Sequence, residues 1–296
     1  MKKYVIWTYP NLTLKKKKYT TLLRSTLIEF LKDSIYTQHL RFGKKIKEVL
    51  ELKGKFLIKF EDNTSDFVDF IIVADGIFSN TRSFFEKKKN EPKYKKAVAV
   101  RAILKSKSDL RINEQNISLL MGDNSHIVLY PTSKKKKLNM VCIIRSKKYN
   151  PDNIKSLIKN TVLKQNPNLK IIFDNEIKSW PLYFTPKILP SSNKKVFYIG
   201  DAFNGFLPTL AQGASQSIES AYEIFNLLKD DKLGRANDYF EERSKRAKII
   251  RKRSNINFFA FHLSSLIMQK IRNIFLRFLV KRKTFIEGYL GKVYKN

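Results

Sequence analysis

A short apolar strand that is followed by Gly-Asp and then by a predicted helix constrains this chain more than any other segment. The strand spans residues 196–199, Gly200 and Asp201 follow it, and Gly213 lies near the start of an apolar-periodic stretch. That stretch predicts a helix over about 210–229, whose first N–H groups and positive dipole end point back toward the strand. Ligands bind at the carboxyl ends of strands in open α/β sheets. The segment therefore predicts a site for a polar ligand.

The two residues after this strand suit such a site. Gly200 lets a ligand approach the backbone without meeting a Cβ atom. Asp201 can accept hydrogen bonds from ligand hydroxyls, and it can equally cap the loop or helix that follows. Both interpretations of Asp201 remain open from its position alone.

A second segment repeats this arrangement earlier in the chain. Residues 71–74 predict a buried strand, Asp75 and Gly76 follow it directly, and Arg82 comes shortly after. It therefore offers a second carboxylate and a second glycine directly after an apolar strand.

Together the two segments resemble the flavin-binding motifs of the FAD-dependent aromatic hydroxylases, which include para-hydroxybenzoate, salicylate and ubiquinone-biosynthesis hydroxylases. That family has Gly-Asp-Ala-Ala-His, a Pro, Gln-Gly and a helix with Glu-Asp after one strand, and Ala-Asp-Gly, Ser and Arg after another. The matching residues are Gly200, Asp201, Ala202, Phe203, Asn204, Pro208, Gln212, Gly213, Glu219 and Ser220, and Ala74, Asp75, Gly76, Ser79 and Arg82. Phe203, Asn204 and Ser220 depart from the family's Ala, His and second acid.

The resemblance implies that FAD is the ligand. The cofactor-binding residues that it assigns are Arg24, Asp75, Gly76, Arg82, Gly200, Asp201, Pro208, Gln212, Gly213 and Ala214. By this resemblance Asp201 binds the ribityl hydroxyls, and the N–H groups of residues 211–214 face the flavin edge that becomes negative on reduction. Asp75, Gly76 and Arg82 support the pyrophosphate and its loop. A solvated arginine is the alternative for Arg24, a plain salt bridge is the alternative for Arg82, and no catalytic residue is assigned.

The Gly-x-Gly-x-x-Gly turn that holds the FAD pyrophosphate in the resembled family does not occur in this sequence. The chain has 10 glycines and none precedes Gly43. We therefore expect an incomplete FAD site without its N-terminal βαβ unit. Three explanations stay open: a truncated gene product, a separately encoded N-terminal segment, or a descendant that no longer holds FAD tightly.

The fold class expected is α/β, or mixed α+β: an incomplete FAD-binding Rossmann-like domain with an inserted antiparallel substrate-binding sheet and a long C-terminal helical region. The predicted parts are a partial FAD-binding domain at 1–94, the antiparallel sheet at 95–180, the second half of the FAD-binding domain at 181–232, and the helical region at 233–296. The resemblance places the substrate's aromatic ring over the inserted sheet.

Local patterns predict the elements of these parts. The first are a helix over 20–32, with Thr20 or Thr21 as N-cap, and a hairpin over 46–60 with its turn at Lys53-Gly54. Four antiparallel strands follow over 97–104, 117–121, 127–130 and 138–144. A helix over 152–164 and a linker through Trp180-Pro181-Leu182 come next. Alternating apolar residues in the four short runs are typical of an antiparallel sheet.

The formal net charge of +33 is far from that of an ordinary domain. Such a charge attracts nucleic acid, anionic lipid or an anionic cofactor. The alternative is AT-rich codon usage, because lysines recur in runs at 15–18, 87–89 and 134–137, where turns are expected. None of these runs is interleaved with aromatic residues as in a single-strand-binding groove, so no specific nucleic-acid site is predicted.

Cysteine and histidine usage favours a reducing compartment and no metal site. Cys142 is the single cysteine and lies in an apolar run, so a buried, unreactive thiol is expected. His39, His126 and His262 lack the spacing of metal ligands. No secretory signal and no membrane span is recognised. We expect a cytoplasmic protein, with a peripheral position at the membrane as the alternative.

A long helical stretch is predicted over 235–283, and its second part is basic, amphipathic and rich in Phe, Leu and Ile. A core or homodimer helix is one interpretation. A helix lying in an anionic membrane surface is the other.

The resemblance implies an FAD-dependent monooxygenase that hydroxylates an aromatic or phenolic ring, with a ubiquinone precursor as one candidate, using NADH or NADPH and O₂. The alternatives are an inactive remnant, a basic membrane-surface or interaction protein without redox activity, or a related flavin-dependent reductase or halogenase.

Overall fold

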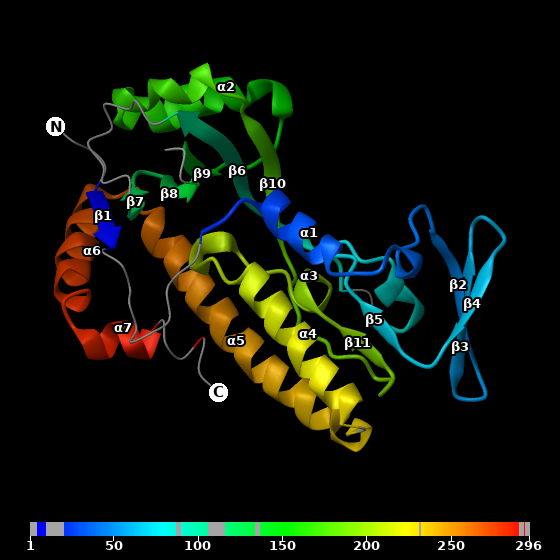
Figure 1. Cartoon of the computed structure of the whole chain (residues 1–296). Coiled ribbons are helices and arrows are strands. Elements are labelled where there is room, and N and C mark those ends of the chain that lie inside the picture. The colour runs from blue at the N-terminus through cyan, green and yellow to red at the C-terminus, as the bar shows by residue number, and fades with distance from the viewer. Residues whose placement is uncertain are drawn as a thin grey trace. The chain divides into compact units, whose positions relative to one another are not determined.

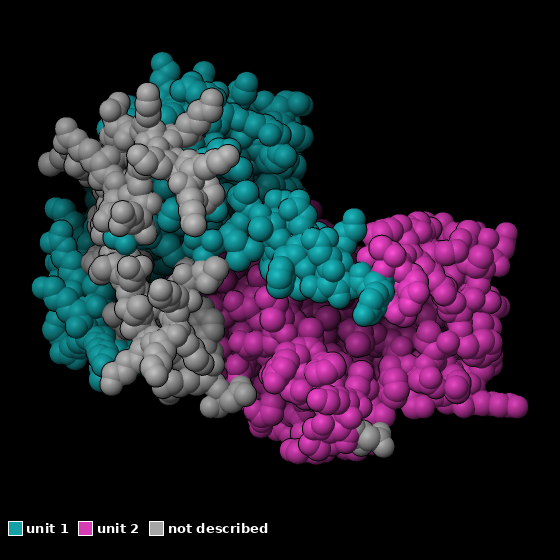
Figure 2. Space-filling view, in the orientation of Figure 1, with its two compact units in different colours: residues 1–36, 95–182, 258–292 teal, residues 37–94, 183–257, 293–296 magenta. Residues whose placement is uncertain are grey.

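The computed structural model describes residues 5–9, 21–86, 90–105, 116–133, 137–230, 232–289 and 293. Residues 10–20, 87–89 and 134–136, which contain the predicted lysine runs except Lys137, lie outside this set. The chain forms two compact units, coloured separately in Figure 2. Unit 1 comprises Met1–Tyr36, Lys95–Leu182 and Phe258–Lys292, and unit 2 comprises Thr37–Tyr94, Tyr183–Asn257 and Val293–Asn296. The domain division at 94, 180 and 232 stays a prediction.

Unit 1 is built on a six-stranded sheet with the strand order β1-β7-β8-β9-β6-β10. The strands are β1 (Val5–Tyr9), β6 (Lys93–Lys105), β7 (Ile117–Met121), β8 (Ser125–Ser133), β9 (Lys137–Arg145) and β10 (Lys178–Phe184). The neighbours β7, β8, β9 and β6 pair antiparallel. The predicted sheet of four antiparallel strands is therefore confirmed.

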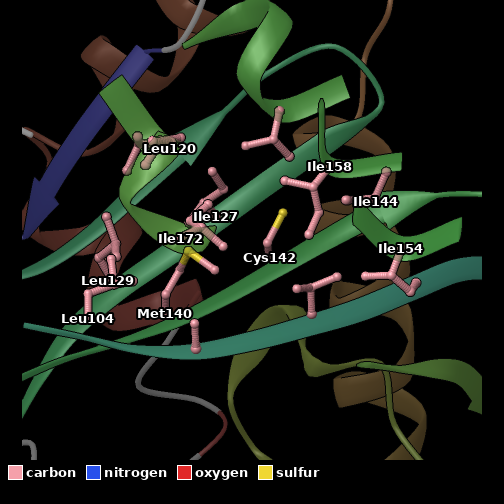
Figure 3. Packing of buried hydrophobic residues seen from close by; sticks show 14 of the residues in the cluster. Leu104, Leu120, Ile127, Leu129, Met140, Cys142, Ile144, Ile154, Ile158 and Ile172 are labelled. Carbon is pink, nitrogen blue, oxygen red and sulfur yellow. The ribbon is translucent and has the colours of Figure 1, made fainter. Parts of the chain in front are cut away.

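One face of this sheet packs against a helical segment, as Figure 3 shows from close by. The segment consists of η3 (Pro151–Asn153), α2 (Ile154–Ile158), the π-helical turn η4 (Lys159–Leu163) and η5 (Pro167–Asp174). Alternate strand residues such as Val100, Met140 and Cys142 point into this core and are almost fully buried. Burial raises the pKa of the Cys142 thiol, as expected for an unreactive cysteine.

The segment around Pro181 is a strand, so its prediction as a linker is wrong. Residues 178–184 form β10, which lies at the edge of the sheet next to β6. Proline cannot donate a backbone hydrogen bond and is tolerated on such an edge. Leu182 is buried, whereas a linker would leave it in water. Pro181, which was predicted to lie in a linker, thus lies on the edge strand of the sheet.

The first helix, α1 (Arg24–Asp33), lacks its predicted cap. Leu23 is the N-cap residue and makes no side-chain capping bond. Thr21 instead donates its hydroxyl to the carbonyl of Pro131 on β8, at 2.6 Å. Thr20 lies outside the described residues. The Thr21 side chain, which the local sequence predicted as a helix cap, instead makes a tertiary hydrogen bond.

The predicted continuous helix over 235–283 is interrupted. It consists of α5 (Ala236–Phe261), α6 (Leu266–Leu279) and the start of α7 (Lys283–Tyr289). Ser265 accepts a hydrogen bond from the Met268 amide and caps α6, so the Ser264-Ser265 pair is where a new helix begins. Among the helices described, none has the length and apolarity that crossing a bilayer requires.

Unit 2 contains a three-stranded antiparallel sheet and a parallel strand pair. The first consists of β2 (Ile46–Leu52), β3 (Lys55–Phe60) and β4 (Ser65–Val68), and the second of β5 (Ile71–Val73) and β11 (Val196–Tyr198). The predicted hairpin is confirmed: Lys53 and Gly54, with φ of 49° and 77°, form the turn between β2 and β3.

Buried clusters lie on both faces of the parallel pair in unit 2. Ile71, Val73 and Tyr198 pack with Phe56 of β3 on one face. Phe197 packs with Ile224 and Phe240 on the other. These last two residues come from α4 (Gly213–Lys229) and α5, which run side by side in Figure 1. Burial on both faces is the usual environment of a parallel strand.

Two histidines form a buried pair in unit 1 that sequence spacing did not indicate. His126 on β8 and His262 after α5 lie with Nδ1 and Nε2 3.1 Å apart, and His262 Nδ1 lies 2.6 Å from the carbonyl oxygen of Phe258. His262 Nδ1 therefore donates to Phe258, and His262 Nε2 accepts from His126. Both rings are neutral in this arrangement. No cluster of three or more potential metal ligands occurs among the described residues.

The histidine pair predicts acid sensitivity. Burial lowers the pKa of His262 to about 4 and lowers that of His126 well below its usual value. Between the unfolded pKa, about 6.5, and the folded pKa, the unfolded chain binds more protons. The free energy of unfolding therefore falls as pH drops from 7 to 5, by about 2 kcal/mol for His262 alone.

His262→Gln should flatten this dependence when urea unfolding is measured at both pH values. The matched control His39→Gln alters an exposed residue and should leave the dependence unchanged. Equal pH slopes for wild type and His262→Gln would contradict the assignment.

Candidate functional site

The two predicted motifs meet because their strands pair in parallel. Val196, Phe197 and Tyr198 of β11 lie opposite Ile71, Ile72 and Val73 of β5. Both strands therefore end at the same edge of the pair. Asp75-Gly76 and Gly200-Asp201 therefore both follow the strands at this edge.

Gly200 is required by its backbone and by its neighbour. Its φ is +55°, and a Cβ atom at this position would lie 2.7 Å from Ser217 Oγ of α4. Ser217 in turn donates that hydroxyl to the Gly213 carbonyl, at 2.9 Å. The end of β11 thus packs directly on the first turns of α4. Glycine here permits close packing of strand and helix.

The N-terminal end of α4 has no side-chain cap. Gln212 is the N-cap residue and makes no capping bond, and the first turn contains no acid. Ala211, with a left-handed φ of 52°, separates α4 from η6 (Pro208–Leu210), so the helix starts at Gly213 rather than near 210 as predicted. The first N–H groups of α4 and its positive dipole end thus have no side-chain cap among the described residues.

Glycines at this edge leave open space. A Cβ atom on Gly76 or Gly213 would meet no atom within 4 Å. Gly76 also has a φ of +88°, which disfavours any other residue. A ligand can therefore approach both loops at their backbone.

Asp75 makes a local contact. Its Oδ2 accepts from the Thr81 amide at 3.2 Å and from the Thr81 hydroxyl at 2.8 Å. These two hydrogen bonds fix the start of η2 (Thr81–Phe84) relative to β5. The side chain orders its loop, while the backbone of Gly76 provides the open surface.

Arg82 links the two motifs through contacts with residues of both. Its guanidinium is almost fully buried, pairs with Glu86, and donates through Nη1 to the Ala202 carbonyl at 2.8 Å. It also lies over the Tyr198 ring, 5.2 Å from its centroid. The salt bridge proposed as an alternative is present, and the separate hydrogen bond to Ala202 holds the turn after β5 against α3 (Gly200–Phe203).

The remaining assigned residues have different environments. Asp201, Pro208 and Ala214 are exposed, and Gln212 is buried. Asp201 lies in the first turn of α3. Arg24 begins α1, which belongs to unit 1, whereas all the other assigned residues belong to unit 2.

Two departures from the family's motif have partners in this structure. Asn204 is fully buried, and its Oδ1 accepts a hydrogen bond from Arg251 of α5. Arg251 also donates to the Pro186 carbonyl, at 2.9 Å. Phe203 fills the cluster around Phe56 and Tyr198. Substitutions at 203 and 204 are thus accommodated by packing and by a hydrogen bond from α5.

The third departure lies within the α4–α5 contact. Ser220 donates its hydroxyl to the Gln216 carbonyl, at 2.6 Å. Arg243 of α5 donates to the same carbonyl and to Gln216 Oε1, and pairs with Glu219. The helix that carries the site is therefore anchored by buried polar bonds. Sequence analysis missed Arg243 and Arg251, because no local pattern links α5 to the loops before it.

Gly200→Ala should destabilise unit 2 by about 3 kcal/mol, because it combines a left-handed φ with a clash against Ser217. Adding Ser217→Ala should recover about 1 kcal/mol of this loss, since it removes the clashing hydroxyl. Gly234→Ala, where a Cβ atom meets nothing within 4 Å, is the matched control and should stay within about 0.5 kcal/mol of wild type. Urea unfolding measures these three variants and the single variant Ser217→Ala; additive effects of the Gly200 and Ser217 changes would contradict the proposed contact.

Sequence comparison relates the chain to known monooxygenases. The chain is 24% identical over 225 residues to the FAD-dependent monooxygenase eupB of Phoma sp, covering 69% of the chain and 50% of that protein. It is 22% identical over 254 residues to 6-hydroxynicotinate 3-monooxygenase of Bordetella bronchiseptica, covering 81% of the chain and 66% of that protein. The chain thus spans about half to two thirds of the length of these relatives.

Structural comparison finds the same fold. Klebsiella pneumoniae HpxO, solved with FAD and uric acid, superposes with a TM-score of 0.77 over 92% of the chain and 71% of its own, at 16% identity. A salicylate hydroxylase substrate complex superposes with a TM-score of 0.73 over 91% of the chain and 74% of its own, at 18% identity. The mixed fold expected from the sequence is thereby confirmed.

A sequence model described as squalene epoxidase matches residues 67–283, which include both strand-end motifs, α4, α5 and α6. This match covers well over half of the chain and agrees with the parallel pair, its two glycine-containing loops and the uncapped α4. The chain belongs to the squalene epoxidase family of FAD-dependent monooxygenases.

Proposed function

We propose that this chain is the larger part of an FAD-dependent monooxygenase that hydroxylates an aromatic or phenolic ring. The reaction converts a ring C–H to C–OH with O₂ and NADH or NADPH, and releases water and the oxidised nucleotide. The observation that carries the proposal is that two strand-end loops follow one edge of the β5–β11 pair, with Gly200 packed on the first turns of the uncapped α4. Flavin relatives with FAD or aromatic substrates in their names support it.

The residues at this edge suit the flavin and ribityl portion of FAD. Gly76 and Gly213 leave backbone surface for a planar ring, and Asp201 offers an exposed carboxylate to hydroxyls. The positive end of α4 stabilises negative charge placed before it. When bound, FAD supplies the electron transfer from the nicotinamide and the activation of O₂; the chain binds it, orients it and sets the local field.

The pyrophosphate portion of FAD needs a further unit, and the β5–β11 pair offers an edge for one. Among the described residues this sheet has two strands, and the Ile71 amide donates to the Lys195 carbonyl while the Ile199 amide donates to Val73. The peptide groups of Ile72 therefore point to the opposite edge of β5. That edge can accept another parallel strand.

Apolar surface around this edge supports the same proposal. Ile72 lies on the same face as its register partner Phe197, yet Ile72 is 46% exposed and Phe197 is fully buried under α4 and α5. One face of α4 also leaves Ile218, Tyr222 and Phe225 exposed. A βαβ unit, encoded with this chain or separately, would add its strand to β5 and cover these side chains with its helix.

Part of the second face of the unit 1 sheet is only half-buried and suits an aromatic substrate. Val128 and Val141 form adjacent positions there, with Arg101 next in the same row. The Arg101 guanidinium lies 4.8 Å from the centroid of the Trp180 ring, and the half-buried Tyr130 projects from the same face. An apolar floor beside a cation and a phenol fits a ring that carries an acidic or phenolic oxygen.

Four narrower elements complete the proposal. The electron donor is NADH or NADPH, and a ubiquinone precursor is a candidate substrate by the resemblance to ubiquinone-biosynthesis hydroxylases. A cytoplasmic location agrees with the single buried cysteine. A homodimer remains a candidate assembly for the exposed apolar surfaces.

The central test is flavin binding with and without the missing unit. The chain is purified alone and co-expressed with a glycine-rich βαβ segment encoded next to it or taken from a relative, and bound FAD is measured by absorbance and fluorescence quenching. We expect co-purification of the two polypeptides and FAD binding about 100-fold tighter than by the chain alone. A co-purified but colourless complex would refute the flavin assignment, whereas a failure to associate would refute the proposed edge of β5.

Two substitutions separate flavin binding from folding. Asp201→Asn should weaken FAD binding about 10-fold through loss of charge-assisted bonds to hydroxyls. Gly213→Asp should raise the helix stability by about 0.5 kcal/mol, because an acid suits a helix N-terminus, and still weaken FAD binding by about 10-fold. Gly234→Asp, at an open position away from the strand ends, is the control. Unchanged FAD affinity in both site variants would exclude this edge as the flavin site.

A further inference from the structure

The helix α6 of unit 1, labelled in Figure 1, is amphipathic, and its buried residues are polar. Gln269 and Arg272 are the buried residues of this helix. The Gln269 amide donates to the Leu263 carbonyl at 2.8 Å, and Arg272 Nη1 donates to the Ala260 carbonyl at 2.9 Å. The side of α6 that contacts unit 1 is therefore held by polar bonds.

The opposite side of α6 is apolar and exposed. Ile267, Ile271, Ile274, Phe275 and Phe278 are 71%, 54%, 69%, 61% and 54% exposed. Their spacing places them on one face of the helix. A continuous apolar stripe of this kind is unusual on a free surface and marks an interaction site.

Cations flank the stripe and acids are absent. Lys270 and Arg277 lie on α6, and Lys281, Arg282 and Lys283 follow its end. The Arg282 guanidinium lies 4.0 Å from the centroid of the Phe278 ring. No Asp or Glu occurs between Glu242 and Glu287. The surface that surrounds the apolar stripe therefore complements an anionic partner.

The length of α6 decides how it can meet a bilayer. Its 14 residues span about 21 Å at a rise of ~1.5 Å per residue, less than the ~30 Å hydrocarbon core. The helix can lie in the interface, with its apolar residues among the acyl chains and its cations at the headgroups.

We propose that α6 docks unit 1 on an anionic lipid surface, with Ile267, Ile271, Ile274, Phe275 and Phe278 inserted below the headgroups. This role is independent of the flavin chemistry. A second copy of the chain is a weaker match, because two such stripes would bring Lys270, Arg277 and Lys281 of each copy close to those of the other.

Vesicle flotation tests the proposal with the full chain. The vesicles are phosphatidylcholine alone or phosphatidylcholine with about 30% phosphatidylglycerol, at about 0.15 M salt, where surface charge is partly screened. We expect flotation with the anionic vesicles only. Absence of flotation with them would overturn the proposal.

A matched pair of variants separates insertion from simple charge attraction. Phe275→Glu on α6 and Phe67→Glu on β4 alter residues that are 61% and 64% exposed and change the charge equally. Phe275→Glu should lower the vesicle partition coefficient about 10-fold or more, and Phe67→Glu less than about 2-fold. Equal losses would show that only net charge acts and would refute insertion.

Two further measurements keep the result decisive. Ile271→Gln, which adds no charge, should lower partitioning about 3-fold or more, and circular dichroism checks that each variant is folded. Light scattering without lipid should show the same mass for wild type and Phe275→Glu. A dimer that Phe275→Glu converts to a monomer, with lipid binding unchanged, would assign the stripe to a second copy and refute the lipid surface.

Discussion

The parallel pairing of β5 with β11 is the constraint on which the candidate site depends. It joins segments separated by more than a hundred residues and brings Gly76 and Gly200 to one edge. Arg82 then bonds across the two motifs, and Gly200 packs on Ser217 of α4. A parallel pair buries both faces, so the β2–β4 sheet on one side and the α4–α5 pair on the other are required for the site to exist.

The sequence predicted what short-range patterns determine. Strands β5 and β11, the turn at Lys53-Gly54 and the antiparallel sheet follow from apolar alternation and glycine positions. It could not predict features set by distant partners. The hydroxyl of Thr21 bonds to Pro131 instead of capping α1, and Pro181 lies in an edge strand because β6 is its neighbour. Neither partner is visible in the local pattern.

The same distinction applies inside the candidate site. The motif match identified Gly200, whose left-handed φ and close contact with Ser217 require glycine, and Gly213, whose surroundings are open. It gave no sign of Arg243 or Arg251, because both come from α5 and act on buried groups of α4 and of the loop after α3. In the sequence, Asn204 was identified only as a departure from the family's His. In the structure it is one half of a buried hydrogen bond with Arg251, which is a different solution for holding the same loop.

The exposed apolar surfaces of α4 and α6 differ in charge, and this difference selects different partners. The stripe Ile218, Tyr222 and Phe225 lies on a helix whose only cation is Lys229 at its end, and it belongs to the same unit as the open edge of β5. Lys229 Nζ lies 5.9 Å from the centroid of the Phe225 ring, so a protein element that covers this stripe meets one cation, at its end. The stripe of α6 is surrounded by cations that a protein core would have to desolvate, whereas anionic headgroups neutralise them in place. The proposed βαβ unit would therefore cover α4, and the proposed lipid surface would cover α6.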